Sequence, residues 1–208
     1  RKRSQAFNRD VIYGVRYEFI PSLLEGNLFS LKNQWILSAD FRFTPRTRTV
    51  FFDRLAVSNF GRDGSDPPRT SRDGFYHDAG FTHYWYSRDF RRYVFFQEEF
   101  NSAFTRGKNF DQLGNTSRLG FHTPLLKKTD LDFSSGLETG FYPNFSSLSS
   151  LDRSRRRDMN WDLYAAVTHH LTPNLALRGF YRFNNSTNQN NFFDYDRHVG
   201  GAQIIYTL

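Results

Sequence analysis

The stretch Val11-Ile-Tyr-Gly-Val-Arg-Tyr-Glu-Phe19 alternates between two unlike sets of side chains. Every odd position from Val11 to Phe19 is apolar or aromatic, whereas the even positions include Arg16 and Glu18. A period of two residues is typical of a β-strand whose two faces meet different environments. The stretch therefore predicts a strand with one apolar face and one polar, charged face.

The same alternation recurs along the chain. Five further stretches have one clearly apolar face: 35–43, 131–141, 161–167, 175–183 and 200–208. Four others are rich in aromatic and apolar residues, but their two faces are harder to distinguish: 49–60, 74–87, 93–104 and 118–125. Together they predict about ten strands of roughly 10–14 residues, longer than the ~5–6 usual in soluble proteins and close to the ~9–11 that cross a membrane.

The connections between these strands alternate in predicted length. Short turns are expected at 44–47, 87–89, 126–129 and 172–174, and longer polar loops at 21–33, 61–73, 105–117, 143–158 and 184–195. Transmembrane barrels have short periplasmic turns and longer extracellular loops. We therefore predict an all-β fold, a transmembrane antiparallel up-and-down β-barrel that forms a single domain over 1–208, with residues 1–9 as a periplasmic N-terminal segment and both termini periplasmic.

Composition excludes several other classes. The 208 residues contain no Cys, which excludes a disulfide framework, a thiol nucleophile and a thiolate metal site. No run of 18 or more apolar residues occurs, so a membrane-spanning helix is excluded. The chain has 28 basic and 21 acidic residues, and 23 of the basic residues are Arg. Such a chain could bind nucleic acid, build Arg–carboxylate networks or face anionic lipid headgroups.

The charged faces of the predicted strands provide the main candidate site. Inside a barrel they would line the lumen, where water and opposite charges can satisfy them. Mixed signs in a narrow barrel indicate either a bracing salt-bridge network or the wall of a narrow selective pore, and both interpretations remain open. The predicted lumen-lining residues are Arg16, Glu18, Asp40, Arg42, Asp130, Asp132, Glu138, Asp162, Arg178 and Arg182.

The end of the chain resembles the C-terminal end of Gram-negative outer-membrane β-barrels. The resemblance rests on the stretches Leu-Thr-Pro-Asn-Leu-Ala-Leu-Arg-Gly-Phe-Tyr-Arg-Phe-Asn-Asn at 171–185 and Phe-Asp-Tyr-Asp-Arg-His-Val-Gly-Gly-Ala-Gln-Ile-Ile-Tyr-Thr-Leu at 193–208. They are similar to the corresponding parts of β-barrel porins and of barrels of the exopolysaccharide-export type. The resemblance implies an outer-membrane location, contact with outer-membrane lipids and lipopolysaccharide, insertion by the barrel-insertion machinery, and contacts with other envelope proteins.

A second candidate site is the basic cluster in the loop at 143–158. Its members are Arg153, Arg155, Arg156 and Arg157. Arginine guanidinium groups bind phosphate well, so the cluster could contact lipopolysaccharide phosphate or a partner, could bind nucleic acid, or could simply be solvated. No spacing of His, Asp and Glu predicts a metal or cofactor site. His169 and His170, for example, are consecutive in a strand and point to opposite faces.

The function that we predict from the sequence is non-enzymatic: a narrow porin-like channel, or a structural subunit of an envelope assembly. One alternative is an omptin-like hydrolase with an active site at the barrel rim, built from Asp196 and His198 with Asp130 and Asp132. Those two pairs fall at opposite ends of the predicted strands, which disfavours it. The other alternative is a soluble, basic, nucleic-acid-binding β protein.

Overall fold

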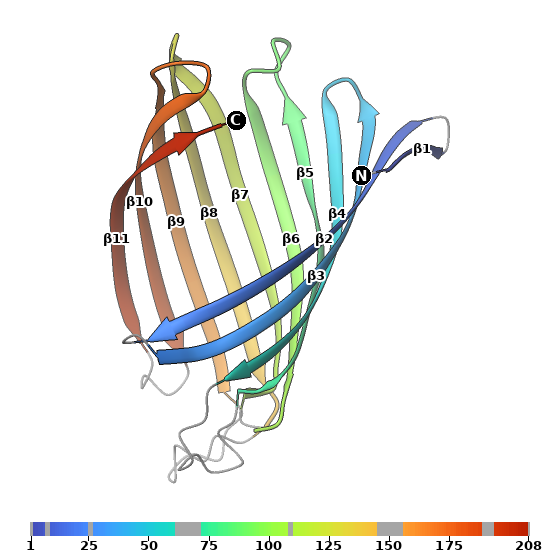
Figure 1. Cartoon of the computed structure of the whole chain (residues 1–208), viewed down its shortest axis with the longest axis vertical. Helices are drawn as coiled ribbons and strands as arrows, with labels where there is room; N and C mark the ends of the chain where they lie inside the picture. Colours follow the sequence, from blue (N-terminus) through green and yellow to red (C-terminus); the bar gives the residue numbers. More distant parts are fainter. Residues whose placement is uncertain are drawn as a thin grey trace.

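The computed structural model describes residues 2–6, 9–24, 27–60, 72–107, 110–144, 156–188 and 194–207. These residues form one antiparallel sheet of 11 strands whose spatial order is the order of the sequence (Figure 1). No helix in this part of the chain is long and apolar enough to span a membrane. The strands are β1 (Lys2–Ala6), β2 (Arg9–Leu24), β3 (Asn27–Thr44), β4 (Thr47–Phe60), β5 (Gly74–Tyr86), β6 (Tyr93–Thr105), β7 (Gln112–Leu126), β8 (Thr129–Tyr142), β9 (Arg156–His170), β10 (Leu175–Asn188) and β11 (Tyr195–Tyr206).

The predicted all-β, up-and-down architecture is confirmed. Each strand from β2 to β11 pairs antiparallel with its neighbours in the sequence, and these ten strands are 12 to 18 residues long. The additional strand, β1, has 5 residues and pairs with the start of β2. The sequence pattern predicted no strand there, only an N-terminal segment.

Several predicted loops are shorter than expected. The loop predicted at 21–33 is mostly strand, because β2 continues to Leu24 and β3 begins at Asn27. The loops predicted at 105–117 and 184–195 likewise contain strand residues from Gln112 onward and up to Asn188. Polar composition suggested loops there, but the backbone hydrogen bonds of a sheet do not require apolar side chains.

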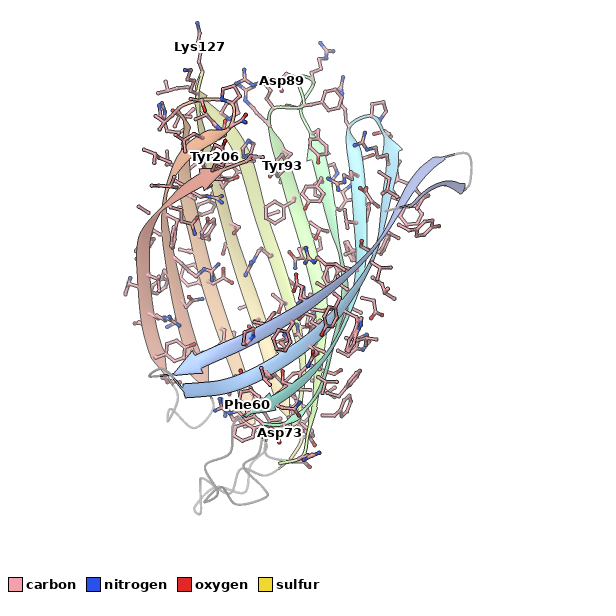
Figure 2. All side chains as sticks on the ribbon, in the orientation of Figure 1. Phe60, Asp73, Asp89, Tyr93, Lys127 and Tyr206 are labelled. Atoms are coloured by element: carbon pink, nitrogen blue, oxygen red, sulfur yellow. The ribbon has the colours of Figure 1, made fainter. Side chains whose placement is uncertain are left out.

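The longest connections nevertheless lie at one end of the sheet. The connections at 45–46, 87–92, 127–128 and 171–174 define the short-turn end, and those at 61–73, 106–111, 143–155 and 189–194 define the long-loop end. In Figure 2, Asp89 and Lys127 mark the first end and Phe60 and Asp73 the second. At the long-loop end only 61–73 and 143–155, with 13 residues each, are longer than every turn at the other end. The connections 106–111 and 189–194 have six residues each, as 87–92 has, and the connection between β2 and β3 has two.

The turn between β5 and β6 shows how a connection at the short-turn end is held. The carboxylate of Asp89 accepts hydrogen bonds from the Ser87 hydroxyl and from the Arg91 amide. These two bonds hold the pKa of Asp89 below its ordinary value, and the bond from Ser87 has the larger effect. Phe90 adopts a positive φ of 56°, which lets the chain reverse inside this turn.

The pairing register gives the sheet two distinct faces. On what we call the apolar face, aromatic side chains run across neighbouring strands. Phe41, Phe51, Phe81 and Phe96 have successive ring centroids 5.7, 6.1 and 6.1 Å apart. Such cross-strand pairs stabilise a sheet and fix its register. The opposite, polar face carries most of the charged side chains of the strands.

No second layer covers either face in the described part of the chain. Val11 is the largest fully buried side chain there, and the other buried apolar residues are four alanines. In contrast, 31 large hydrophobic side chains are exposed. Leu177, on the apolar face, is 45% exposed. The described part of the sheet therefore has no packed hydrophobic core between two layers.

The sheet curls into an open trough (Figure 1). Its polar face is the concave one, since Arg118 of β7 and Asp162 of β9 meet at 2.6 Å across the intervening β8. At the point where they cross, β8 has Gly136, whose missing side chain leaves room for this pair. Glycines on the inner face are a usual means of curving a sheet.

The predicted barrel is not closed in this structure. β1 pairs only with Arg9–Tyr13 of β2, so residues 14–24 of β2 have no neighbour on that edge among the described residues. The outer edge of β11 is likewise unpaired within the described part. The trough thus has two free edges.

Candidate functional site

The polar face of the trough holds all ten residues predicted to line a lumen. Residues that lie opposite each other on neighbouring strands share a face of the sheet, so the pairing register defines one polar face from β2 to β11. Glu18, for example, lies opposite Gln34, and Arg182 lies opposite both Tyr164 and Val199. The ten residues on this face are Arg16, Glu18, Asp40, Arg42, Asp130, Asp132, Glu138, Asp162, Arg178 and Arg182.

One group of ion pairs on this face links β7 to β10. Besides the Arg118–Asp162 pair, Arg178 Nη2 lies 2.9 Å from Asp132 Oδ2. The other oxygen of Asp132 lies 2.8 Å from His122 Nδ1. Each of these contacts except the last passes over one intervening strand, so the group braces four strands from the inside.

A second group links β3 to β6. Asp40 receives two bonds from Arg48, at 2.9 Å from Nε and 2.8 Å from Nη2. Arg54 Nη1 lies 3.1 Å from Asp78 and 3.6 Å from Glu99, on the next two strands. The contact between Arg48 and Asp40 joins two guanidinium nitrogens to the carboxylate, and such two-point contacts are strongly directional.

Sequence reasoning missed several members of this network: Arg48, Arg54, Asp78, Glu99, Arg118 and His122. They lie in β4 to β7, whose two faces could not be told apart in the sequence. The cross-strand register assigns these residues to a face. Asp40, on the polar face of β3, lies opposite Val50, so the even-numbered residues of β4 share that face. That register becomes visible only once the strands are paired.

The remaining predicted residues occupy the edges and ends of the face. Arg16 and Glu18 pair with each other at 2.9 Å on β2, and Gln34 donates to Glu18. Asp130 meets His170 at 2.9 Å near the short-turn end. Glu138 lies opposite Asn160. The structure therefore gathers the set on one surface but divides it among several separate clusters.

A pocket of about 360 Å³ lies on the polar face over β9, β10 and β11. Its polar lining consists of Tyr164, Arg178, Arg182, Asn184, Arg197 and Gln203, and Phe180 and Val199 supply its apolar lining. We call it the arginine pocket. The guanidinium of Arg182 lies over the Tyr164 ring, 5.6 Å from its centroid, an arrangement that favours a cation over the ring face.

The apolar face contains a few ionisable groups near its middle. Asp53 Oδ1 lies 3.3 Å from His77 Nε2. Glu98 accepts hydrogen bonds from Asn115 and, at 2.7 Å, from the Ser117 hydroxyl. Glu98 thus has hydrogen-bond partners on its own face, whereas the contact between Asp53 and His77 is not a hydrogen bond.

The basic cluster predicted at Arg153–Arg157 is divided by the structure. Arg153 and Arg155 lie outside the described residues. Arg156 is on the polar face, where it pairs with Asp158 and lies over Tyr142 at 4.5 Å. Arg157 is on the apolar face, over Phe141 at 6.0 Å, and borders a hollow of about 540 Å³. Consecutive strand residues point to opposite faces, so these two arginines cannot act as one patch.

The residues of the hydrolase alternative lie on different faces. Asp196 and His198 are on the apolar face, where Asp196 accepts from Asn185 and His198 Nδ1 lies 2.6 Å from the Tyr181 hydroxyl. Asp130 and Asp132 are on the polar face, with His170 and His122 as partners. In the described part of the chain, no group of three or more His, Asp and Glu side chains could hold a metal ion.

Comparison with known protein families, curated proteins and solved structures finds no match for this chain. The functional argument therefore rests on the geometry of the two faces.

Proposed function

We propose that this chain forms a transmembrane β-barrel in the outer membrane of a Gram-negative bacterium and acts as a narrow channel. In this proposal the convex apolar face contacts lipid, and the concave polar face lines a water-filled lumen. The observation that carries it is the single layer of long strands with 31 exposed large hydrophobic side chains and no packed core in the described part. An apolar surface of this extent requires a cover, and lipid covers such a surface in membrane barrels.

The two free edges suggest how the barrel closes. β2 and β11 are the first and last of ten alternating strands, so they would meet antiparallel, as closure requires. Aligning their long-loop ends, Leu24 with Tyr195, places Val15 opposite Ile204 and keeps both on the apolar face. These two side chains, each 76% exposed, are the most exposed large hydrophobics in the described residues. Closure would also remove both unpaired edges, which otherwise favour aggregation.

The polar face supports a narrow passage. Barrels near eight strands are largely filled by side chains, and wide aqueous pores need about 16 strands. The Arg54–Asp78 and Arg118–Asp162 pairs lie on the wall of this ten-stranded lumen, where their side chains would narrow the path further. We propose that small ions and solutes pass beside these pairs.

We further propose that Arg157 contacts lipid phosphate. It stands at the long-loop end of the apolar face, beside a hollow that is also lined by Leu113, Phe141 and Met159. An arginine fork next to an apolar surface suits a headgroup phosphate with its acyl chain. Insertion by the barrel-insertion machinery, and contacts with other envelope proteins, would accompany an outer-membrane location.

Single-channel recording in planar lipid bilayers tests the proposed channel. We expect discrete conductance steps from the purified, refolded protein, and a changed conductance in the Arg182→Glu variant, because Arg182 lies on the proposed lumen wall. The Arg91→Glu variant, in an exposed turn, makes the same charge change away from the wall and should conduct like the wild type. Correctly inserted protein without conductance would overturn the channel and leave a structural barrel.

A further inference from the structure

We infer that the arginine pocket binds the oxyanion group, phosphate or carboxylate, of a small solute. The inference rests on the proposed function in one respect, because a solute reaches the pocket through the lumen. It adds to that function a ligand class and a binding site at a defined place on β9, β10 and β11.

The pairing register builds the pocket. Arg178 lies opposite Gln203, and Asn184 lies opposite Arg197 on the neighbouring strand. Between these pairs Gly201 lies opposite Phe180, and a Cβ at Gly201 would come within 2.7 Å of the Phe180 ring. The ring therefore packs over the glycine. Three arginines and two side-chain amides surround the resulting hollow.

The charge of the pocket is not balanced from within. In the open trough no carboxylate of the described residues lines it. The proposed closure would place Glu18 opposite Gly201, but Glu18 already pairs with Arg16 at 2.9 Å, so this pair adds no net charge to the pocket. Arg178 has Asp132 as a partner, 2.9 Å away, but Arg182 and Arg197 have no ion pair with any acidic residue among those described. On the same face, Arg48, Arg54 and Arg118 each pair with a carboxylate. The arginine pocket is thus a place on the polar face where guanidinium groups remain available to a ligand.

The donor set and the volume favour an oxyanion. Planar guanidinium groups donate two parallel hydrogen bonds to phosphate or carboxylate, a geometry that chloride cannot match. The Tyr164 ring, 5.6 Å from the Arg182 guanidinium, favours the cation at this place. A volume of about 360 Å³ lies at the lower end of the range of small-molecule pockets and admits a phosphate group with part of a small organic solute.

Calorimetric titration of the refolded protein in detergent with inorganic phosphate, at constant ionic strength set by chloride, tests the site. We expect saturable binding of one phosphate per chain, and a dissociation constant raised about tenfold or more by Arg182→Gln or by Arg197→Gln. Arg182→Lys keeps the charge but loses the two-point contact, so it should also weaken binding. Arg91→Gln should bind like the wild type.

Both arginines are exposed and make no ion pair in the described structure, so the fold should tolerate their removal. Circular dichroism and heat-modifiable gel migration confirm that each variant is folded. Absence of saturable phosphate binding, or equal weakening by Arg91→Gln, would overturn the site.

A bilayer measurement separates this inference from the channel. If the protein conducts, we expect the reversal potential in a KCl gradient to show anion selectivity that Arg182→Gln with Arg197→Gln reduces. A conducting protein that binds no phosphate would overturn the pocket and leave the channel. A protein that binds phosphate but does not conduct would support the pocket and overturn the channel.

Discussion

Gly136 shows how a single residue serves both the curvature of the sheet and its ion pairs. It lies in β8 directly between Arg118 and Asp162. A Cβ at this position would come within 2.5 Å of Asp162 Oδ1 and 3.0 Å of Arg118 Nε. The glycine is therefore required by the pair that crosses it rather than by an unusual backbone conformation.

Gly136→Ala is expected to displace the Arg118–Asp162 pair and to lower the free energy of unfolding by about 1 kcal/mol. Urea denaturation in lipid vesicles or detergent micelles, followed by tryptophan fluorescence, measures the change. Gly179→Ala is the matched control, because nothing lies within 4 Å of the position that its new methyl group would occupy, and the substitution should be neutral or slightly stabilising. Equal effects at the two glycines would show that the pair contributes nothing.

At the scale of the strand, β6 places two consecutive glutamates in opposite environments. Glu98 is on the apolar face with Asn115 and Ser117, whereas Glu99 is on the polar face, 3.6 Å from Arg54. If lipid covers the apolar face, the charge of Glu98 costs free energy there, whereas that of Glu99 is compensated by Arg54.

We expect Glu98→Gln to raise the free energy of unfolding in lipid vesicles by about 1 kcal/mol, because it removes a charge from the lipid side. Glu99→Gln should lower it by about 1 kcal/mol, because it removes an ion-pair partner. The two variants change neighbouring residues in the same way, so each controls for the other. If Glu98→Gln lowers the free energy of unfolding instead of raising it, protein or water rather than lipid covers this face.

How far each strand could be predicted depended on its own pattern. In β2 and β10 the apolar residues occupy one face almost without interruption, so Arg16, Arg178 and Arg182 were placed correctly on the other. In β4 and β6, Asp53 and Glu98 lie on the apolar face and conceal the alternation. Bulges add to the difficulty: the register shifts between Pro124 and Leu126, where the proline has no amide to donate.

The ends of the strands and the arginine pocket could not be predicted from the sequence for a different reason. Polar residues such as Lys32 and Asn33 continue a strand because a neighbouring strand supplies backbone partners, which no local pattern reveals. The pocket needs Arg197 of β11 beside Arg182 of β10, and that proximity depends on a hairpin register. Predicting ten strands and their polar face was possible; predicting which charges meet was not.

At the scale of the whole molecule, the proposed barrel requires that the free edges of β2 and β11 pair with each other. We expect that Val15→Cys combined with Ile204→Cys forms a disulfide in the membrane-inserted protein, since antiparallel closure brings the two positions together. Val15→Cys combined with Leu119→Cys, on a strand well removed from both edges, is the control and should stay reduced. A cross-link that forms only between different chains would show that the edges meet another copy.

The central claim is that lipid touches the apolar face and water the polar face. The most direct measurement is a spin-label scan along residues 176–183 of β10 in lipid vesicles, with oxygen as the membrane-soluble probe and a nickel chelate as the water-soluble probe. The account predicts strict alternation, with oxygen contact at the odd positions 177, 179, 181 and 183 and nickel contact at the even positions. Equal access of the nickel chelate at all positions, or labels immobilised by protein at the odd ones, would contradict it.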